Sequence, residues 1–220
     1  IVLKARPVDR ATQAAWAPAP LDEVIATIER ERPALVFAPH VETASGILLP
    51  DDYLESVADA THTAGGLCVL DAVASGALWV DMRALGIDVL ISAPQKGWSA
   101  PPSSALVMLG ERALDRIGNT RSTSFAADLS RWLAIMGAYE NGGHAYHATL
   151  PTDALARFRD SMRETVAEGL EVTRERQWDL GRRVRALFAE RGMNSVAADG
   201  FAAPGVVVCY TEDDGLPDKF

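Results

Sequence analysis

Short apolar runs alternate with polar and helix-like stretches over the first half of the chain. Such runs occupy residues 34–38, 67–70 and 89–91, and each is bounded by polar or turn-forming residues. Continuous runs of this length are typical of strands that are covered on both faces, as in a parallel sheet. A fourth run, 105–109, follows a link that is rich in Pro and Ser and short for a parallel crossover, which favours an antiparallel strand.

Helical patterns occupy the stretches between the first three runs. Residues 51–63 repeat apolar positions with a helical period, and Asp51 stands where a capping residue is expected. Residues 81–85 make a shorter helical stretch that Gly86 closes. The alternation of strands and helices predicts an α/β fold with right-handed crossovers and a mainly parallel sheet.

A long helical pattern dominates the second half of the chain, over residues 152–192. Gly169 and Gly181 are unfavourable inside a helix, so we expect a bend or a break there. Residues 206–210 then have the apolar character of a strand.

The change from an alternating pattern to one long helix indicates a domain boundary. We predict that residues 1–155 form a large α/β domain. Residues 156–220 are then a connecting helix and the start of a smaller α+β domain. The chain has neither an initiator Met nor a signal peptide, so we expect it to be part of a longer protein.

The composition narrows the range of partners. The formal net charge is -9 and 48% of the residues are hydrophobic, which suits a protein with a substantial core. The charge argues against nucleic acid or an anionic membrane as a partner, and no apolar run approaches the roughly 20 residues that span a bilayer. Cys68 and Cys209 each lie in an apolar run, so we expect two buried free thiols and a cytoplasmic location.

Asp71 and Lys96 are the residues most suggestive of chemistry. Asp71 directly follows the run 67–70, and Lys96 lies in the loop after the run 89–91. The carboxyl ends of parallel strands face the crevice where α/β proteins bind ligands, so an acid and an amine should share one edge of the sheet.

This pair matches the needs of pyridoxal phosphate (PLP), which forms an imine with a lysine amine and requires a carboxylate against its ring nitrogen. A lysine that is displaced from the imine by an amino substrate is free to move a proton. Taken alone, however, Asp71 also suits a turn or a helix cap, and Lys96 also suits a solvated loop. The spacing by itself leaves both interpretations open.

Longer motifs favour the first interpretation. The order is Asp-Ala-Val-Ala-Ser at 71–75, Gly-Ile-Asp-Val-Leu-Ile-Ser-Ala-Pro-Gln-Lys at 86–96 and Ala-Pro-Pro at 100–102. These motifs resemble those of the class V aminotransferases, which have the PLP fold type I, and within them the alanine–glyoxylate and serine–glyoxylate (serine–pyruvate) group. The resemblance extends from about residue 4 to residue 210.

The resemblance implies a role for five residues near the cofactor. Lys96 matches the Schiff-base lysine, Asp71 the partner of the ring nitrogen, and Val73 the residue that packs on one face of the ring. Gln95 matches the glutamine that precedes the family's lysine. Thr43, in Glu-Thr-Ala-Ser-Gly at 42–46, matches the residue that bonds the ring hydroxyl. An ordinary turn threonine is the alternative for Thr43.

The segment Tyr-His-Ala-Thr-Leu-Pro at 146–151 resembles another family motif. There the Tyr and the Thr, matched by Tyr146 and Thr149, reach the cofactor phosphate of the neighbouring subunit, which implies a homodimer with shared active sites. A cap for the long helix is the alternative. Ala148 replaces a His of the family pattern, and Trp98 is larger than expected, so it either narrows the substrate pocket or covers the loop.

The implied reaction is ping-pong transamination from a small amino acid, alanine or serine, to a small 2-oxo acid, glyoxylate or pyruvate. The family's phosphate turn, its ring-stacking aromatic and its carboxylate-binding arginine match no position of this chain. Two alternatives remain: a lyase or cysteine desulfurase of the same fold, and a non-catalytic homologue. His144 and His147 have a spacing found in metal sites, but no acid or Cys cluster accompanies them, so no metal is expected.

Overall fold

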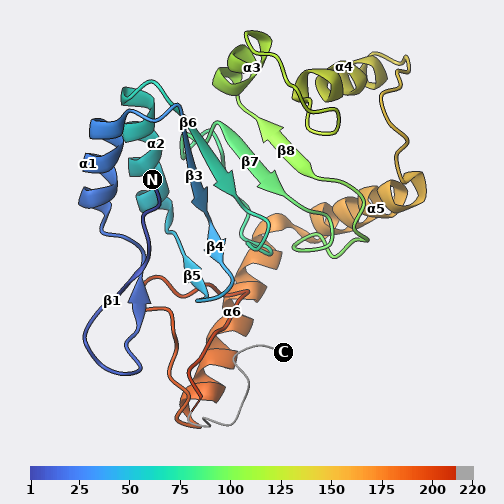
Figure 1. Cartoon of the computed structure of the whole chain (residues 1–220). Helices are drawn as coiled ribbons and strands as arrows, with labels where there is room; N and C mark the ends of the chain where they lie inside the picture. The colour runs from blue at the N-terminus through green and yellow to red at the C-terminus, as the bar shows by residue number, and fades with distance from the viewer. Residues whose placement is uncertain (212–220) are drawn as a thin grey trace.

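The computed structural model describes residues 1–211, and its centre is a four-stranded sheet. The strands lie in the order β3, β6, β7, β8 (Figure 1), with the bounds Leu35–Pro39, Leu67–Asp71, Val89–Ser92 and Leu106–Leu109. The first three are parallel and β8 is antiparallel to β7. The four predicted strands, the parallel sheet and the antiparallel fourth strand are therefore confirmed.

Two helices, α1 (Leu21–Glu31) and α2 (Asp51–Thr63), cover one face of this sheet and enclose the main core (Figure 1). Leu54 of α2 and Leu70 of β6 are fully buried between them. The helix over 51–63 is confirmed, but the capping role of Asp51 is wrong. Pro50 is the N-cap and makes no side-chain bond, so Asp51 lies in the first turn, where an acid suits the helix dipole.

Smaller elements surround this layer. They are β1 (Arg6–Pro7), β2 (Trp16–Ala17), β4 (Val41–Glu42), β5 (Ile47–Leu48), α3 (Glu111–Gly118) and α4 (Leu129–Glu140). Helices α1, α3 and α4 were not predicted from the sequence. The helix expected over 81–85 is wrong: the backbone makes one turn, closed by the bond from Leu85 N–H to the Asp81 carbonyl (3.1 Å) and ended by Gly86 with φ 66°.

The long helical pattern forms two helices, α5 (Thr152–Glu168) and α6 (Leu170–Ala189). Gly169, with φ 105°, separates them, which confirms the expected break. Gly181, in contrast, lies inside the continuous helix α6, so the break expected there is wrong. A Cβ at this position would lie 2.7 Å from the Cα of Pro204, so only Gly permits this close approach. No helix in the described part of the chain has the length and apolar character that crossing a membrane requires.

The strand expected over 206–210 is wrong. This segment makes only a single bridge, between Ser195 and Cys209, and belongs to no sheet. Cys209 is consequently half-buried, against the expectation of a buried thiol, whereas Cys68 on β6 is fully buried as expected.

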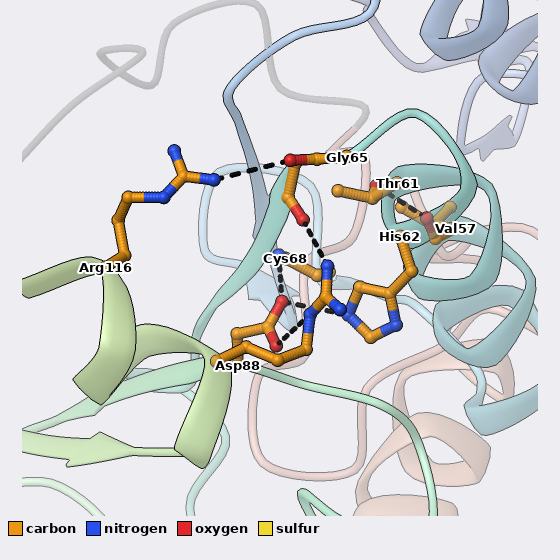
Figure 2. Close-up of polar contacts among 9 residues, drawn as sticks. Val57, Thr61, His62, Gly65, Cys68, Asp88 and Arg116 are labelled. Atoms are coloured by element: carbon orange, nitrogen blue, oxygen red, sulfur yellow. Dashed lines mark hydrogen bonds and ion pairs between the residues drawn. The ribbon is translucent and has the colours of Figure 1, made fainter.

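A buried carboxylate ties the sheet to α2 and α3 at the amino ends of the parallel strands. Figure 2 shows Asp88 beside Cys68 and His62. Its Oδ2 accepts hydrogen bonds from the Cys68 backbone N–H at 2.7 Å and from His62 Nε2 at 2.9 Å, while Oδ1 pairs with Arg112 Nε at 3.4 Å. Because Asp88 directly precedes β7, these contacts fix β7 against β6.

Burial of the Cys68 thiol, together with the Asp88 charge, raises the pKa of that thiol to about 12. At neutral pH it is therefore a thiol and not a nucleophilic thiolate.

We expect Asp88→Ala to lower the free energy of unfolding by roughly 1–3 kcal/mol, because it leaves the buried N–H of Cys68 without an acceptor and removes the partner of the His62 ring and the Arg112 guanidinium. Urea unfolding followed by circular dichroism measures this loss. Asp115→Ala, on the exposed side of α3, is the matched control and should change the value by less than about 0.5 kcal/mol. Equal values for the two variants would contradict the anchoring role of Asp88.

Candidate active site

The pairing of β6 with β7 brings Asp71 and the loop of Lys96 to one edge of the sheet. Asp71, the last residue of β6, lies opposite Ile91 of β7, and the N–H of Ala72 donates to the Ile91 carbonyl at 2.8 Å. The chain leaves β7 at Ser92 and turns over residues 94–98, which contain Lys96. The two loops therefore start side by side at the carboxyl ends of neighbouring parallel strands, as the sequence predicted.

Two glycines allow these loops to touch. A Cβ on Gly97 would overlap the carbonyl oxygen of Gly76, so the backbone next to Lys96 rests directly on the loop that follows Asp71. Gly76 itself has φ 63°, a conformation that L side chains rarely adopt. The contact between the acid's loop and the amine's loop therefore depends on the absence of a side chain at Gly97 and on the positive φ that Gly76 permits.

Lys96 extends its side chain from a compact turn. The N–H of Ser99 donates to the Lys96 carbonyl at 3.0 Å, and that of Ala100 donates to the Pro94 carbonyl at 3.0 Å. The Lys96 and Gln95 side chains are exposed, and no hydrogen bond or ion pair involving the Lys96 amine occurs among the described residues. Because the sequence has just three lysines, Lys4, Lys96 and Lys219, few amines compete with it.

The Asp71 carboxylate is also exposed. Its Oδ1 accepts a hydrogen bond from the N–H of Val73 at 3.0 Å, which orients the carboxylate from its own loop. Val73 is half-buried beside it. A carboxylate held by one oxygen can still present the other to a ligand.

Thr43 lies in the tight turn between β4 and β5. Glu42 shapes this turn: its carboxylate accepts bonds from the Ser45 hydroxyl at 2.6 Å and from the backbone N–H groups of Ala44 and Ser45 at 2.9 and 2.8 Å. Burial by itself would raise the pKa of Glu42, but these bonds outweigh it and hold the pKa below its ordinary value. The Thr43 side chain is left exposed at the tip.

A buried histidine connects the Thr43 turn with the Asp71 loop. The backbone N–H of His40 donates to the Asp71 carbonyl at 2.8 Å. The ring Nδ1 of His40 shares a hydrogen bond with the Ser75 hydroxyl, also at 2.8 Å. Burial, offset in part by Asp51 and reinforced by Arg174, lowers the pKa of His40 from 6.5 to about 4. The sequence analysis did not identify Ser75 as a partner of this histidine.

Trp98, at the end of the lysine turn, packs against two other aromatic rings. Its ring lies 4.6 Å from that of Trp79 and 6.0 Å from that of Phe158 on α5, measured between centroids. Of the two roles considered for Trp98, these contacts favour the covering of the loop. Trp79 and Phe158 were missed because their positions along the chain give no hint of this cluster.

Tyr146 and Thr149 are exposed in the segment between α4 and α5. Their hydroxyls share a hydrogen bond at 3.0 Å, so they can act as one pair of donors. No described hydrogen bond connects this pair to Asp71 or Lys96. His147 packs on Phe125 and Trp132, and residues 1–211 contain no cluster of His, Cys, Asp and Glu suited to a metal ion.

The residues at this edge fit PLP in chemical type. An amine without a described partner can form an imine, and a carboxylate on the adjoining strand can face a ring nitrogen. Thr43 lies four residues beyond the end of β3, the other parallel neighbour of β6, in the turn that β4 leads into.

Comparison with known proteins identifies relatives of the chain. It is 30% identical over 182 residues to alanine–glyoxylate aminotransferase of Oryctolagus cuniculus, covering 81% of this chain and 45% of that protein. It is 29% identical over 182 residues to 2-aminoethylphosphonate–pyruvate transaminase of Salmonella paratyphi B, covering 80% of this chain and 46% of that protein. The chain thus spans about half the length of these relatives. No family model matches it.

Among solved structures, alanine–glyoxylate aminotransferase of Nostoc sp. superposes with a TM-score of 0.78 at 24% identity. The superposition covers 90% of this chain and 51% of that one.

We expect the stability of the protein to fall as the pH drops from 6.5 toward 4. The unfolded chain binds a proton at His40 in this range while the folded chain does not, so the loss is on the order of 3 kcal/mol. Urea unfolding across this range measures it. His40→Asn should reduce the slope, whereas His144→Asn, at an exposed position, should leave it intact. A slope that is the same in all three proteins would contradict this assignment.

Proposed function

Because the chain is a relative of the alanine–glyoxylate and other class V aminotransferases and has their fold, we propose that it forms the lysine-bearing part of a PLP-dependent aminotransferase. One observation carries the proposal: the amine of Lys96 and the carboxylate of Asp71 leave one edge of the sheet from adjacent parallel strands, in loops that touch at Gly76 and Gly97. Such an edge is where α/β folds bind ligands.

In this proposal each predicted residue acts on one part of the cofactor. Lys96 holds the PLP aldehyde and Asp71 keeps the ring nitrogen protonated. Val73 packs on the ring, Gln95 lies beside it, and Thr43 donates to the ring hydroxyl. When bound, PLP accepts the amino group and withdraws electrons from the substrate carbon, while Lys96 moves the proton that this carbon loses.

The proposed substrates are a small amino acid such as alanine or serine, and a small 2-oxo acid such as glyoxylate or pyruvate. The names of the relatives support this class, since glyoxylate and pyruvate both occur in them. The relatives also differ in their amino donor, so we propose the class of donor and not one compound.

The two cysteines support transamination over desulfuration. A desulfurase needs a mobile, reactive cysteine, whereas Cys68 is fully buried and has its pKa raised to about 12. Burial also raises the pKa of Cys209, although Arg185 opposes this shift. Neither thiol is activated as a nucleophile.

A homodimer with shared active sites belongs to the same proposal. Tyr146 and Thr149 would bind the phosphate of the neighbouring subunit's cofactor. Nearby α4 exposes Leu133, Met136 and Tyr139, which is apolar surface suited to a partner subunit. The division into domains at residues 155 and 156, just inside α5, and a cytoplasmic location also remain proposals.

Trapping with borohydride tests the cofactor lysine. PLP added to the full chain should be reduced onto Lys96, and mass spectrometry of the peptides can distinguish Lys96 from Lys4 and Lys219. Lys96→Ala should abolish both the visible-edge absorbance band of PLP and the trapped peptide. Lys4→Ala is the control and should change neither. Trapping that favours Lys4 or Lys219 would contradict the proposal, and a band without amino-group exchange would point to a non-catalytic homologue.

Mixed subunits test the shared site. Lys96→Ala and the double variant Tyr146→Phe/Thr149→Val should each be weak in PLP-dependent activity. If the phosphate is bound across the interface, mixing the two variants should restore part of the activity. At random association about half of the dimers are mixed, and each mixed dimer has one intact site. Activity that stays at the level of the separate variants would rule out sharing. The double variant should also lose affinity for PLP but not for pyridoxal, which has no phosphate.

A further inference from the structure

One side chain of α6 holds the loop that follows Asp71. Gln177 donates from Nε2 to the carbonyl of Ser75 at 3.1 Å, and its Oε1 accepts from the N–H of Ala77 at 2.8 Å. These bonds join residues about one hundred positions apart in the chain. The amide therefore uses both its donor and its acceptor to hold the backbone on either side of Gly76.

The Gln177 amide lies in a narrow space between two glycines. A Cβ on Gly76 would overlap Oε1 of Gln177, and a Cβ on Gly205 would lie 3.3 Å from its Cδ. This close packing leaves little free space between the amide and the two glycine backbones.

Gly76 transmits this contact to the lysine loop. The carbonyl of Gly76 lies against Gly97, whose Cα has no room for a side chain. The order in space is therefore the Gln177 amide, the Gly76 peptide and Gly97, which is the residue next to Lys96. A displacement of the Gln177 amide would therefore change the backbone contact that supports Gly97.

Trp79 joins the same two parts of the chain a short distance away. Its indole Nε1 donates to the Leu170 carbonyl and to the Thr173 hydroxyl, each at 3.0 Å, at the start of α6. Its ring packs on Trp98, two residues after Lys96. The lysine loop is thus supported by α6 through two separate routes.

We propose that Gln177 is a positioning residue for Lys96: by fixing the Gly76 peptide it sets where the turn over 94–98 presents the amine. This inference rests on the proposed function, because it concerns the reactivity of the cofactor lysine. Gln177 does not contact the reacting atoms. Its effect is geometric, and a displacement of about 1 Å at a reacting group can cost as much as a hundredfold in rate.

Substitutions at Gln177 separate this role from simple packing. Gln177→Leu removes both hydrogen bonds at similar volume. Gln177→Glu keeps the acceptor for Ala77 but opposes a carboxylate to the Ser75 carbonyl. Glu175→Gln, at an exposed site on the same helix, is the matched control.

The measurement is the rate at which pyridoxal and borohydride label Lys96 in the full chain, with Lys4 as an internal reference. Pyridoxal lacks the phosphate, so the rate reports on the lysine and not on a phosphate site. We expect labelling of Lys96 to be about tenfold slower in Gln177→Leu and reduced in Gln177→Glu, with Lys4 unchanged and Glu175→Gln equal to the unsubstituted chain. Thermal unfolding of the same samples shows whether they are folded at the temperature of labelling.

The possible outcomes distinguish a failure of the positioning role from a failure of the proposed function. Equal labelling of Lys96 in the unsubstituted chain and in a folded Gln177 variant would overturn the positioning role while leaving the cofactor lysine in place. If Gln177→Leu does not fold, Gln177→Glu gives the comparison. No labelling of Lys96 in the unsubstituted chain, beside normal labelling of Lys4, would contradict the proposed function itself.

Discussion

The structure depends on the parallel pairing of β6 with β7. The opposition of Asp71 and Ile91 decides which loops emerge together, and a shift by one residue would turn every side chain of a strand to the other face of the sheet. Asp88 fixes this register from the other end, because its carboxylate binds the N–H of Cys68 while its own residue leads into β7. A charged cluster at the amino ends of the strands thus secures the geometry at their carboxyl ends.

The polar residues at the two ends of the sheet have different roles: those at the amino ends stabilise the fold, and those at the carboxyl ends are available for chemistry. At the amino ends, Asp88 is buried and engaged by His62, Cys68 and Arg112, which leaves it no capacity for a ligand. At the carboxyl ends, Asp71 and Lys96 are exposed and only partly engaged. Polar groups that are fully satisfied rigidify a protein, and those that retain free capacity are the ones able to meet a cofactor and substrates.

The lysine loop is not held by its own sequence alone. Glycines at 76 and 97 let two loops stack, and Gln177 and Trp79 connect that stack to α6. Helix α6, which begins after the Gly169 break, therefore supports the loops of the candidate site from outside the sheet. The two glycines at the contact and the two hydrogen bonds of Gln177 hold the lysine loop in place and leave the Lys96 amine exposed.

The sequence by itself determined the four strands of the central sheet, the parallel arrangement of the first three, the α/β class and the common edge of Asp71 and Lys96. These features follow from local patterns. A short apolar run predicts a strand, and a residue that directly follows such a run is expected at the carboxyl edge of the sheet. Local patterns gave wrong predictions for two segments of only five residues. Residues 81–85 make a single turn and not a helix, and residues 206–210 make one bridge, at Cys209, and not a strand. They also did not indicate Gln177, Trp79 or Phe158. Apart from the stacking of Trp79 on Trp98, the contacts of these side chains join residues that lie some sixty to one hundred positions apart, and only the packing of α5 and α6 against the loops that follow β6 and β7 brings them together.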